Sequence, residues 1–184
     1  FPGIIREEGM VINDTDPYYR LHRIEQIIEG PSVYPLHDSM LTPPLGLDVP
    51  WPLGLDLTLA LPLKILRIHT RRVVELFSSF AIPLLSIPTL WAVERIGTLL
   101  FSPWVGWGGA FLLALSPASI NASSLGRIDH HFLEAMLTVL ALYFLFRTRT
   151  TKPKPGWISL GFLLSLGPSF WPQAWVISFF LAGS

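Results

Sequence analysis

One stretch decides the fold: HFLEAMLTVLALYFLF at His131–Phe146, followed directly by RTRTTKPK at Arg147–Lys154. The first part is almost entirely apolar and approaches the length of about 20 residues that a helix needs to cross a membrane. The second part holds four basic residues and no acidic one. Short loops that are rich in Lys and Arg stay in the cytoplasm. The two parts together predict a membrane helix that begins outside the cytoplasm and ends inside it.

The composition of the whole chain agrees with a membrane protein. Of its 184 residues, 51% are hydrophobic and only 14% are charged, whereas a soluble domain carries about 25% charged residues. The 13 basic and 13 acidic residues cancel, which argues against a nucleic-acid partner. Cysteine is absent, so disulfides and thiolate metal sites are excluded. Both ends of the sequence look cut, and we expect a part of a longer protein.

The apolar segments predict an all-α protein with about four membrane spans. The predicted spans are residues 73–93, 96–115, 131–146 and 156–181. Pro83 and Pro88 interrupt the first span, and Glu94-Arg95 is predicted to end it. The second span contains the segment Trp104–Gly109, whose glycines would allow close contact between helices. The chain therefore divides into an outer region, residues 1–72, and a transmembrane region, residues 73–184.

The outer region is predicted to be a long irregular loop that contains two helices. Asp16 suits the cap of the first helix and Pro17 its first position, and Gly30-Pro31 ends it. Its apolar stripe consists of Leu21, Ile24, Ile27 and Ile28, with Arg20 and Arg23 largely off the stripe. This helix would lie on the membrane surface or against other helices. The second helix, over residues 53–66, is too short to span and is predicted to be interfacial.

Polar side chains gather at two membrane entrances. The first group surrounds Asp16, and the second contains Asp129, His130 and His131 at the start of the third span. Counting back two spans places both groups on the same outer side. Residues i and i+2 of an extended or capping segment point the same way, so Asp129 and His131 can bind one ion, with Asp16 as the natural third ligand. Carboxylates suit Mg²⁺, and an added imidazole favours Mn²⁺ or another transition metal.

Simpler roles stay open for the same residues. Asp16 and Asp129 could each serve only as a helix cap. Glu134 lies close to the membrane interface, where snorkelling or a hydrogen bond would explain it. A transporter or channel could use Asp129, His130 and His131 as an ion relay, although relay groups are expected deeper in the spans.

Three motifs resemble the catalytic subunit of asparagine-linked oligosaccharyltransferase. Asp16-Pro17-Tyr18-Tyr19, with the basic run after it, is similar to the first outer loop of that family. The segment Val49–Asp56 resembles the tryptophan-proline part of the same loop. Leu115–Pro117 and Ser123–Glu134 resemble the second acidic motif, in which prokaryotic members often have Asp-x-His. The similarity covers about residues 10–147.

The resemblance implies a type C glycosyltransferase fold in a multi-pass membrane protein of a prokaryotic plasma or inner membrane, with active-site loops outside the cytoplasm. The implied reaction moves an oligosaccharide from a polyprenyl (pyro)phosphate carrier to the Asn of Asn-x-Ser/Thr in an acceptor polypeptide. It inverts the anomeric carbon and uses Mn²⁺ or Mg²⁺. Asp16 would bind the metal and the acceptor amide, and Asp129 and His131 would complete the ligands from this part of the chain. His130 and Arg127 would contact substrate.

Some parts expected from the resemblance are missing from these residues. They are a first membrane helix, a later carboxylate, and a tryptophan-aspartate motif in a C-terminal domain. We therefore expect this chain to be catalytically incomplete by itself. Arg20 stands where a histidine is expected, so neither Arg20 nor His22 is given a role. Another type C enzyme, such as an O-mannosyltransferase or a lipid-linked sugar transferase, is the main alternative, and the Asp-x-His motif argues against it.

Overall fold

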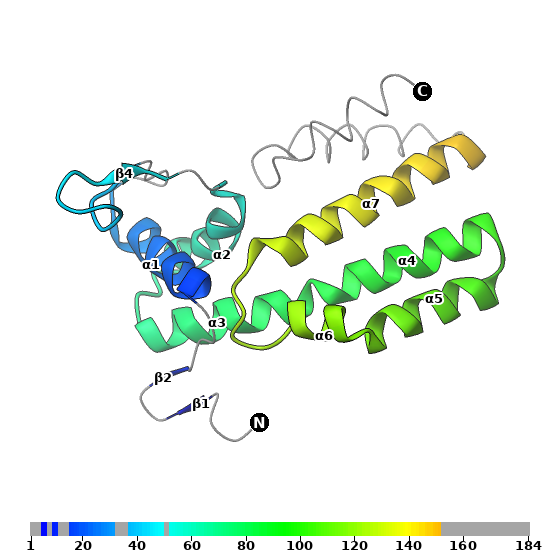
Figure 1. The fold of residues 1–184 in the computed structure, drawn as a ribbon, viewed down its shortest axis with the longest axis horizontal. Helices are drawn as coiled ribbons and strands as arrows, with labels where there is room; N and C mark the ends of the chain where they lie inside the picture. Colours follow the sequence, from blue (N-terminus) through cyan, green and yellow to red (C-terminus); the bar gives the residue numbers. More distant parts are fainter. Residues whose placement is uncertain (1–4, 7–8, 11–14, 32–36, 50–51, 152–184) are drawn as a thin grey trace.

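The computed structural model describes residues 5–6, 9–10, 15–31, 37–49 and 52–151, which are mostly helical (Figure 1). The helices are α1 Thr15–Glu29, α2 Gly54–Ile65, α3 Arg71–Leu84, α4 Ser86–Leu100, α5 Pro103–Leu115, α6 Pro117–Ala122 and α7 His130–Thr151. Two short antiparallel pairs of strands, β1 Ile5–Arg6 with β2 Gly9–Met10 and β3 His37–Asp38 with β4 Leu47–Asp48, lie in the outer region. The predicted all-α class is confirmed. The predicted span 156–181 lies outside the described residues.

Helices α3 and α4 together form a rod of 30 residues, Arg71–Leu100, which is long and apolar enough to cross a membrane. At about 1.5 Å per residue the rod measures about 45 Å. The two helices are separated only at Leu85. Pro88 explains the interruption, because it has no N–H to donate to the carbonyl of Leu84 and its ring crowds that carbonyl.

Helix α4 does not end at Glu94-Arg95, where the sequence predicts the end of the first span. Helix α4 continues through both residues to Leu100, because Glu and Arg are good helix formers and their charges are paired here. Glu94 accepts a hydrogen bond from the hydroxyl of Thr98 at 2.9 Å and lies 3.2 Å from the guanidinium of Arg95. A charged pair in the sequence therefore did not mark a helix boundary.

The predicted second span, 96–115, does not form one continuous helix. The chain turns at Phe101 and Ser102, and α5 then runs back along α4 for only 13 residues (Figure 1). The hydroxyl of Ser102 accepts from the N–H of Val105 at 3.4 Å, a capping contact at the start of α5. The second span of the prediction is thus the end of one helix and a shorter returning helix.

Glycine allows the close contact between α4 and α5. A Cβ atom added to Gly97 would lie 2.6 Å from the Cα of Gly106, and one added to Gly106 would lie 2.4 Å from the carbonyl oxygen of Glu94. The predicted close approach is confirmed at Gly106. It does not extend to Gly108, where an added Cβ would meet nothing within 4 Å.

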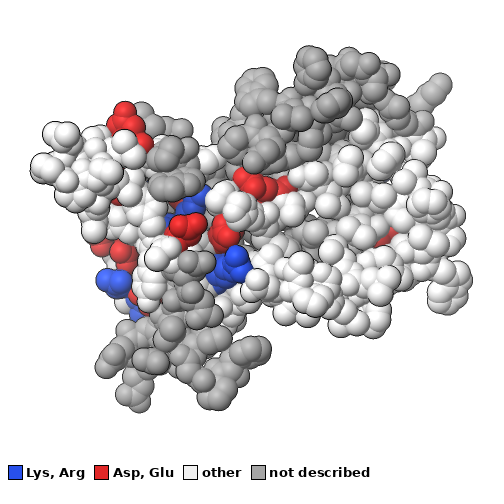
Figure 2. All heavy atoms as spheres, viewed as in Figure 1, with Lys and Arg blue, Asp and Glu red and all other residues white. Residues whose placement is uncertain are grey.

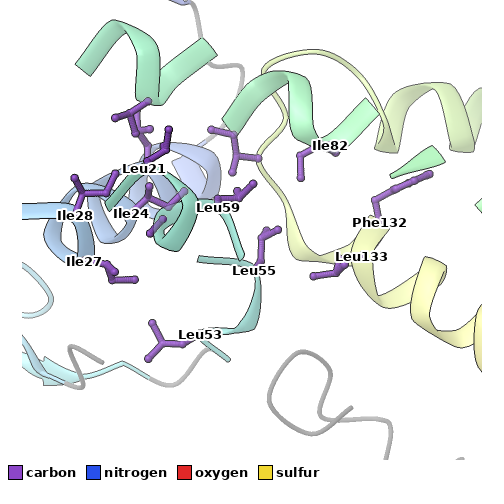
Figure 3. Packing of buried hydrophobic residues seen from close by; sticks show 14 of the residues in the cluster. Leu21, Ile24, Ile27, Ile28, Leu53, Leu55, Leu59, Ile82, Phe132 and Leu133 are labelled. Carbon is purple, nitrogen blue, oxygen red and sulfur yellow. The ribbon is translucent and has the colours of Figure 1, made fainter. Parts of the chain in front are cut away.

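The first turns of α7 are held against the outer region by one hydrophobic cluster (Figure 3). The contributions come from Leu21, Ile24, Ile27 and Ile28 of α1, Leu53 just before α2, Leu55, Leu59, Ala60 and Leu63 of α2, Val74 and Ile82 of α3, Ile128 just before α7, and Phe132, Leu133 and Met136 of α7. Each fully buried aliphatic or aromatic side chain contributes about 1.5–3 kcal/mol. This cluster fixes the start of α7 beside α1, and helix α7 includes a second segment that could cross a membrane, His130–Thr148.

Charge is unevenly distributed over the molecule. In the view of Figure 2, acidic and basic side chains gather over α1–α3 and the start of α7, whereas the surface over α4 and α5 is almost free of them. Several large apolar side chains of α5 are exposed: Trp104, Trp107, Phe111, Leu112 and Leu115. An apolar surface of this extent fits contact with lipid.

Candidate functional site

The second polar group lies where the chain enters α7. Gly126 adopts a left-handed conformation with φ +83°, which glycine takes without steric cost. Ile128 is fully buried and anchors the segment in the hydrophobic cluster. Asp129 follows, and its Oδ1 accepts a hydrogen bond from the N–H of His131 at 3.4 Å. Asp129 therefore caps α7, as the simpler interpretation of this residue predicts.

The same carboxylate also lies in a group of three potential metal ligands. Asp129, His130 and His131 can each offer one atom, and the three atoms all lie within 4.8 Å of one another. Nδ1 of His130 is 3.0 Å from Oδ1 of Asp129, although the two are not aligned for a hydrogen bond. Ligands of one Mn²⁺ or Mg²⁺ ion are separated by about 3–4 Å, so a small movement would bring these three atoms around an ion. The donor set of one carboxylate and two imidazoles fits Mn²⁺.

The electrostatic environment keeps Asp129 ionised. Burial by itself would raise the pKa of this carboxyl, but the adjacent His130 and His131 rings and the N–H of His131 stabilise the charged form, and the pKa falls to about 2. Arg127 lies on the other side, with Nε 3.8 Å from Oδ2 of Asp129. The ionised carboxylate is the form that binds a metal cation.

Glu134 joins this group one turn further along α7. Its Oε2 lies 3.3 Å from Nδ1 of His131, and its Oε1 lies 3.9 Å from Nε2 of His130. The sequence interpretation allowed Glu134 a hydrogen bond but gave it no part in the metal site. Its spacing of three and four residues from the two histidines is the signal that places all three on one helix face.

The first polar group meets the second in a small pocket. Asp16, Tyr19 and Arg20 of α1 line it together with His130 of α7. Its volume is about 10 Å³, which is room for roughly one water molecule or one ion. The structure thus places Asp16 and His130 around one pocket. Asp16 is exposed and does not belong to the close three-residue group of Asp129, His130 and His131.

The helix that carries Asp16 begins slightly earlier than predicted. Helix α1 starts at Thr15, so Asp16 lies within the first turn instead of preceding it. An acidic residue in a first turn still interacts favourably with the positive end of the helix dipole. Its carboxylate is therefore held at a helix start without being the cap.

A family comparison identifies the kind of protein to which this site belongs. The model described as "Oligosaccharyl transferase STT3, N-terminal" matches residues 6–182, which is nearly the whole chain. The chain belongs to this family. No curated protein matches it. The STT3 family is one of membrane-associated glycosyltransferases, and the resemblance at Asp16–Tyr19 and Ser123–Glu134 is consistent with that assignment.

The sequence interpretation missed the side chains that support the pocket of this STT3 domain. Arg20 and Arg23 are buried, not off the buried face as predicted, because both contact the fully buried Asp56 of α2. Nη1 of Arg20 donates to Oδ1 of Asp56 at 3.1 Å and to the carbonyl of Pro52 at 3.1 Å. Burial raises the pKa of Asp56, and the two guanidinium groups and His130 oppose this. Two basic residues three positions apart, followed by a lone acid in an apolar helix, are the signal that could have revealed the pairing.

A second buried acid holds the other side of α1. The hydroxyl of Tyr19 donates to Oδ2 of Asp38 at 3.0 Å, and Nε2 of His22 lies 3.7 Å from the same oxygen. Burial and the neighbouring Asp38 raise the pKa of Tyr19 to about 12. Tyr19 is therefore neutral and a hydrogen-bond donor at physiological pH. Asp38 fixes one wall of the pocket and gives His22 a structural partner.

Proposed function

We propose that this chain supplies the metal-binding part of the active site of an oligosaccharyltransferase. The proposed reaction transfers a glycan from a polyprenyl (pyro)phosphate carrier to the Asn side chain of an Asn-x-Ser/Thr acceptor, with inversion at the anomeric carbon. The observation that supports it best is the group Asp129, His130 and His131, which lies at the start of α7 beside the pocket that Asp16 lines. Family membership supports the reaction class.

Asp129 and His131 are the proposed metal ligands from α7, and Asp16 is the proposed ligand from α1. A bound Mn²⁺ or Mg²⁺ would stabilise the negative charge of the leaving (pyro)phosphate. The residues fit such an ion because Asp129 is ionised at physiological pH and its neighbours can present imidazole nitrogen. Asp16 is also proposed to accept hydrogen bonds from the acceptor amide. Gripping that amide would weaken the conjugation of its nitrogen lone pair and make it a better nucleophile.

His130 and Arg127 are proposed to contact substrate beside these ligands. The observation that supports this role for His130 is that it lines the same pocket as Asp16. Arg127 has the charge to meet a phosphate, and its present neighbour is the carboxylate of Asp129. We further propose that this end of the molecule faces the outside of a prokaryotic plasma or inner membrane, since the basic segment Arg147–Lys154 favours the cytoplasm.

An ion relay in a transporter is less well supported. Relay groups belong deep in membrane helices, whereas Asp129 precedes α7 and His130 and His131 occupy its first turn. Glu94 lies deeper, in α4, but it is paired with Thr98 and Arg95. The arrangement fits a site at the membrane surface.

The test uses the full-length protein and measures glycopeptide formation with added Mn²⁺. Asp16→Ala and Asp129→Ala are each expected to reduce kcat/KM by a factor of about 100 or more, the scale on which groups that stabilise charge at a reacting centre contribute. Asp48→Ala is the matched control, because Asp48 also lies in the outer region but is exposed and contacts only the exposed His37 among the described side chains. Activity near wild type in both test variants would end the assignment.

A further inference from the structure

Glu134 lies beside the two histidines of the proposed metal group and approaches both. Its carboxylate approaches Nδ1 of His131 with one oxygen, at 3.3 Å, and Nε2 of His130 with the other, at 3.9 Å. The side chain is only 14% exposed, while that of His131 is 67% exposed. A largely buried polar side chain needs hydrogen-bond partners, and the two imidazoles can supply them.

The two imidazoles differ in their contacts with the neighbouring carboxylates. His130 has a carboxylate near each of its ring nitrogens: Asp129 at 3.0 Å from Nδ1 and Glu134 at 3.9 Å from Nε2. For His131 the contact with Glu134 involves Nδ1. When Nδ1 carries the proton that Glu134 accepts, the lone pair of His131 lies on Nε2, which is then the nitrogen available to a metal.

We propose that Glu134 is a positioning residue for the metal centre. It accepts the Nδ1–H of His131, fixes the tautomer and the ring orientation, and raises the basicity of the opposite nitrogen. Histidines that bind metals commonly donate their other N–H to a carboxylate in this way, and removal of that partner lowers metal affinity by about 10–100-fold. The inference rests on the proposed function, because it requires that His131 binds the metal.

The experiment measures Mn²⁺ binding to the detergent-solubilised full-length protein, by calorimetry and by electron paramagnetic resonance of the bound ion. Glu134→Ala is expected to raise the Kd for Mn²⁺ by about 10–100-fold and to weaken the nitrogen coupling in the spectrum. Glu134→Gln keeps an oxygen that can accept the Nδ1–H, so it is expected to restore part of the affinity. Circular dichroism and the thermal midpoint of each variant report on folding.

Glu75→Ala is the matched control. Glu75 is also an acid near the start of a long helix, its side chain is 10% exposed, and it pairs with Arg71 four residues away at 3.0 Å. A purely structural role for Glu134 predicts similar effects of both alanine variants on Mn²⁺ affinity, and that result would overturn the inference.

The outcomes separate the inference from the proposed function. Wild-type protein that binds Mn²⁺, with binding lost in Asp129→Ala but unchanged in Glu134→Ala and Glu134→Gln, would contradict the inference alone. Wild-type protein that binds no Mn²⁺ would contradict the metal centre, and the role of Glu134 with it. If Glu134→Ala does not fold, Glu134→Gln decides: unchanged affinity together with unchanged nitrogen coupling would overturn the inference.

Discussion

Removal of the Asp56 carboxylate should be among the most damaging single changes in the outer region. Asp56 is fully buried, and it contacts two guanidinium groups that are themselves buried, those of Arg20 and Arg23. Asp56→Ala leaves both positive charges in an apolar environment with their main acidic partner removed. Breaking a buried ion pair by removing one partner costs about 3–5 kcal/mol.

This cost is large compared with the total stability of a folded domain, about 5–15 kcal/mol. For a chain of this size, about 1 kcal/mol corresponds to about 2–4 °C in the melting temperature. The thermal midpoint of the Asp56→Ala variant in detergent is therefore expected to fall by about 6–20 °C. Because Arg20 also lines the pocket with Asp16 and His130, glycopeptide formation should fall in the full-length protein even below the midpoint.

Asp48→Ala provides the comparison, since its carboxylate is 86% exposed and pairs with an exposed histidine. An exposed pair contributes about 0–1 kcal/mol, so the midpoint of this variant should move by only a few degrees. If Asp56→Ala melts as close to wild type as Asp48→Ala does, the two arginines do not depend on Asp56, and the reasoning from buried charge is refuted.

Three other predictions concern the helices around the site. Gly106→Ala should lower the thermal midpoint, because the added Cβ would lie 2.4 Å from the carbonyl oxygen of Glu94 and overpacking lowers the free energy of unfolding by about 1–3 kcal/mol. Gly108→Ala, where the added Cβ meets nothing within 4 Å, should be neutral or stabilising. Ile128→Ala should lower the free energy of unfolding by about 2–5 kcal/mol, since Ile128 is fully buried beside Asp129. Ile120→Ala, at a residue that is 55% exposed, should lower it little. Chemical denaturation measures both variants, and equal midpoints would contradict the role of Ile128 as an anchor. The pKa of Asp129 is lowered from 3.8 to about 2, so its ionised form contributes stability that is complete above about pH 4 and is lost as the pH falls through 2. The thermal midpoint of wild type, measured with a chelator present, should therefore exceed that of Asp129→Asn above pH 4, and the difference should shrink toward pH 2; a difference that grows on acidification would contradict the sign.

Local patterns in the sequence were sufficient to predict the elements that carry the site. The apolar run after His130 and the stripe of Leu21, Ile24 and Ile28 are periodic signals, and both segments are helices. The grouping of Asp129, His130 and His131 is also local, because neighbouring residues at a helix start cannot lie far apart. These features depend on chain geometry over a few residues, which a single sequence contains.

Features that depend on distant partners could not be predicted in the same way. Arg20 and Arg23 were expected off the buried face, since charged residues on a helix usually face water. Their burial depends on Asp56, which belongs to a different helix. The sequence also predicts the end of a span at the charged pair Glu94-Arg95. In the structure both residues lie inside α4, where Glu94 pairs with Arg95 and accepts a hydrogen bond from Thr98. In each case the position of the charged side chain depends on a partner side chain that the hydrophobic pattern does not include.

The proposed site combines two helix starts, and this imposes a condition on any metal that it binds. Asp16 lies in the first turn of α1 and Asp129 caps α7, so the positive ends of two helix dipoles lie near one pocket. Arg20 and Arg127 add further positive charge. A divalent cation would be repelled from such a place without acids close by, and Asp16, Asp129 and Glu134 supply them. The same surroundings favour an anion, so a cation held by these carboxylates would meet a phosphate group in a setting that stabilises its negative charge. Helix capping and metal binding by Asp129 are therefore compatible: the hydrogen bond that caps α7 uses Oδ1 and also helps to keep the carboxylate ionised for a cation.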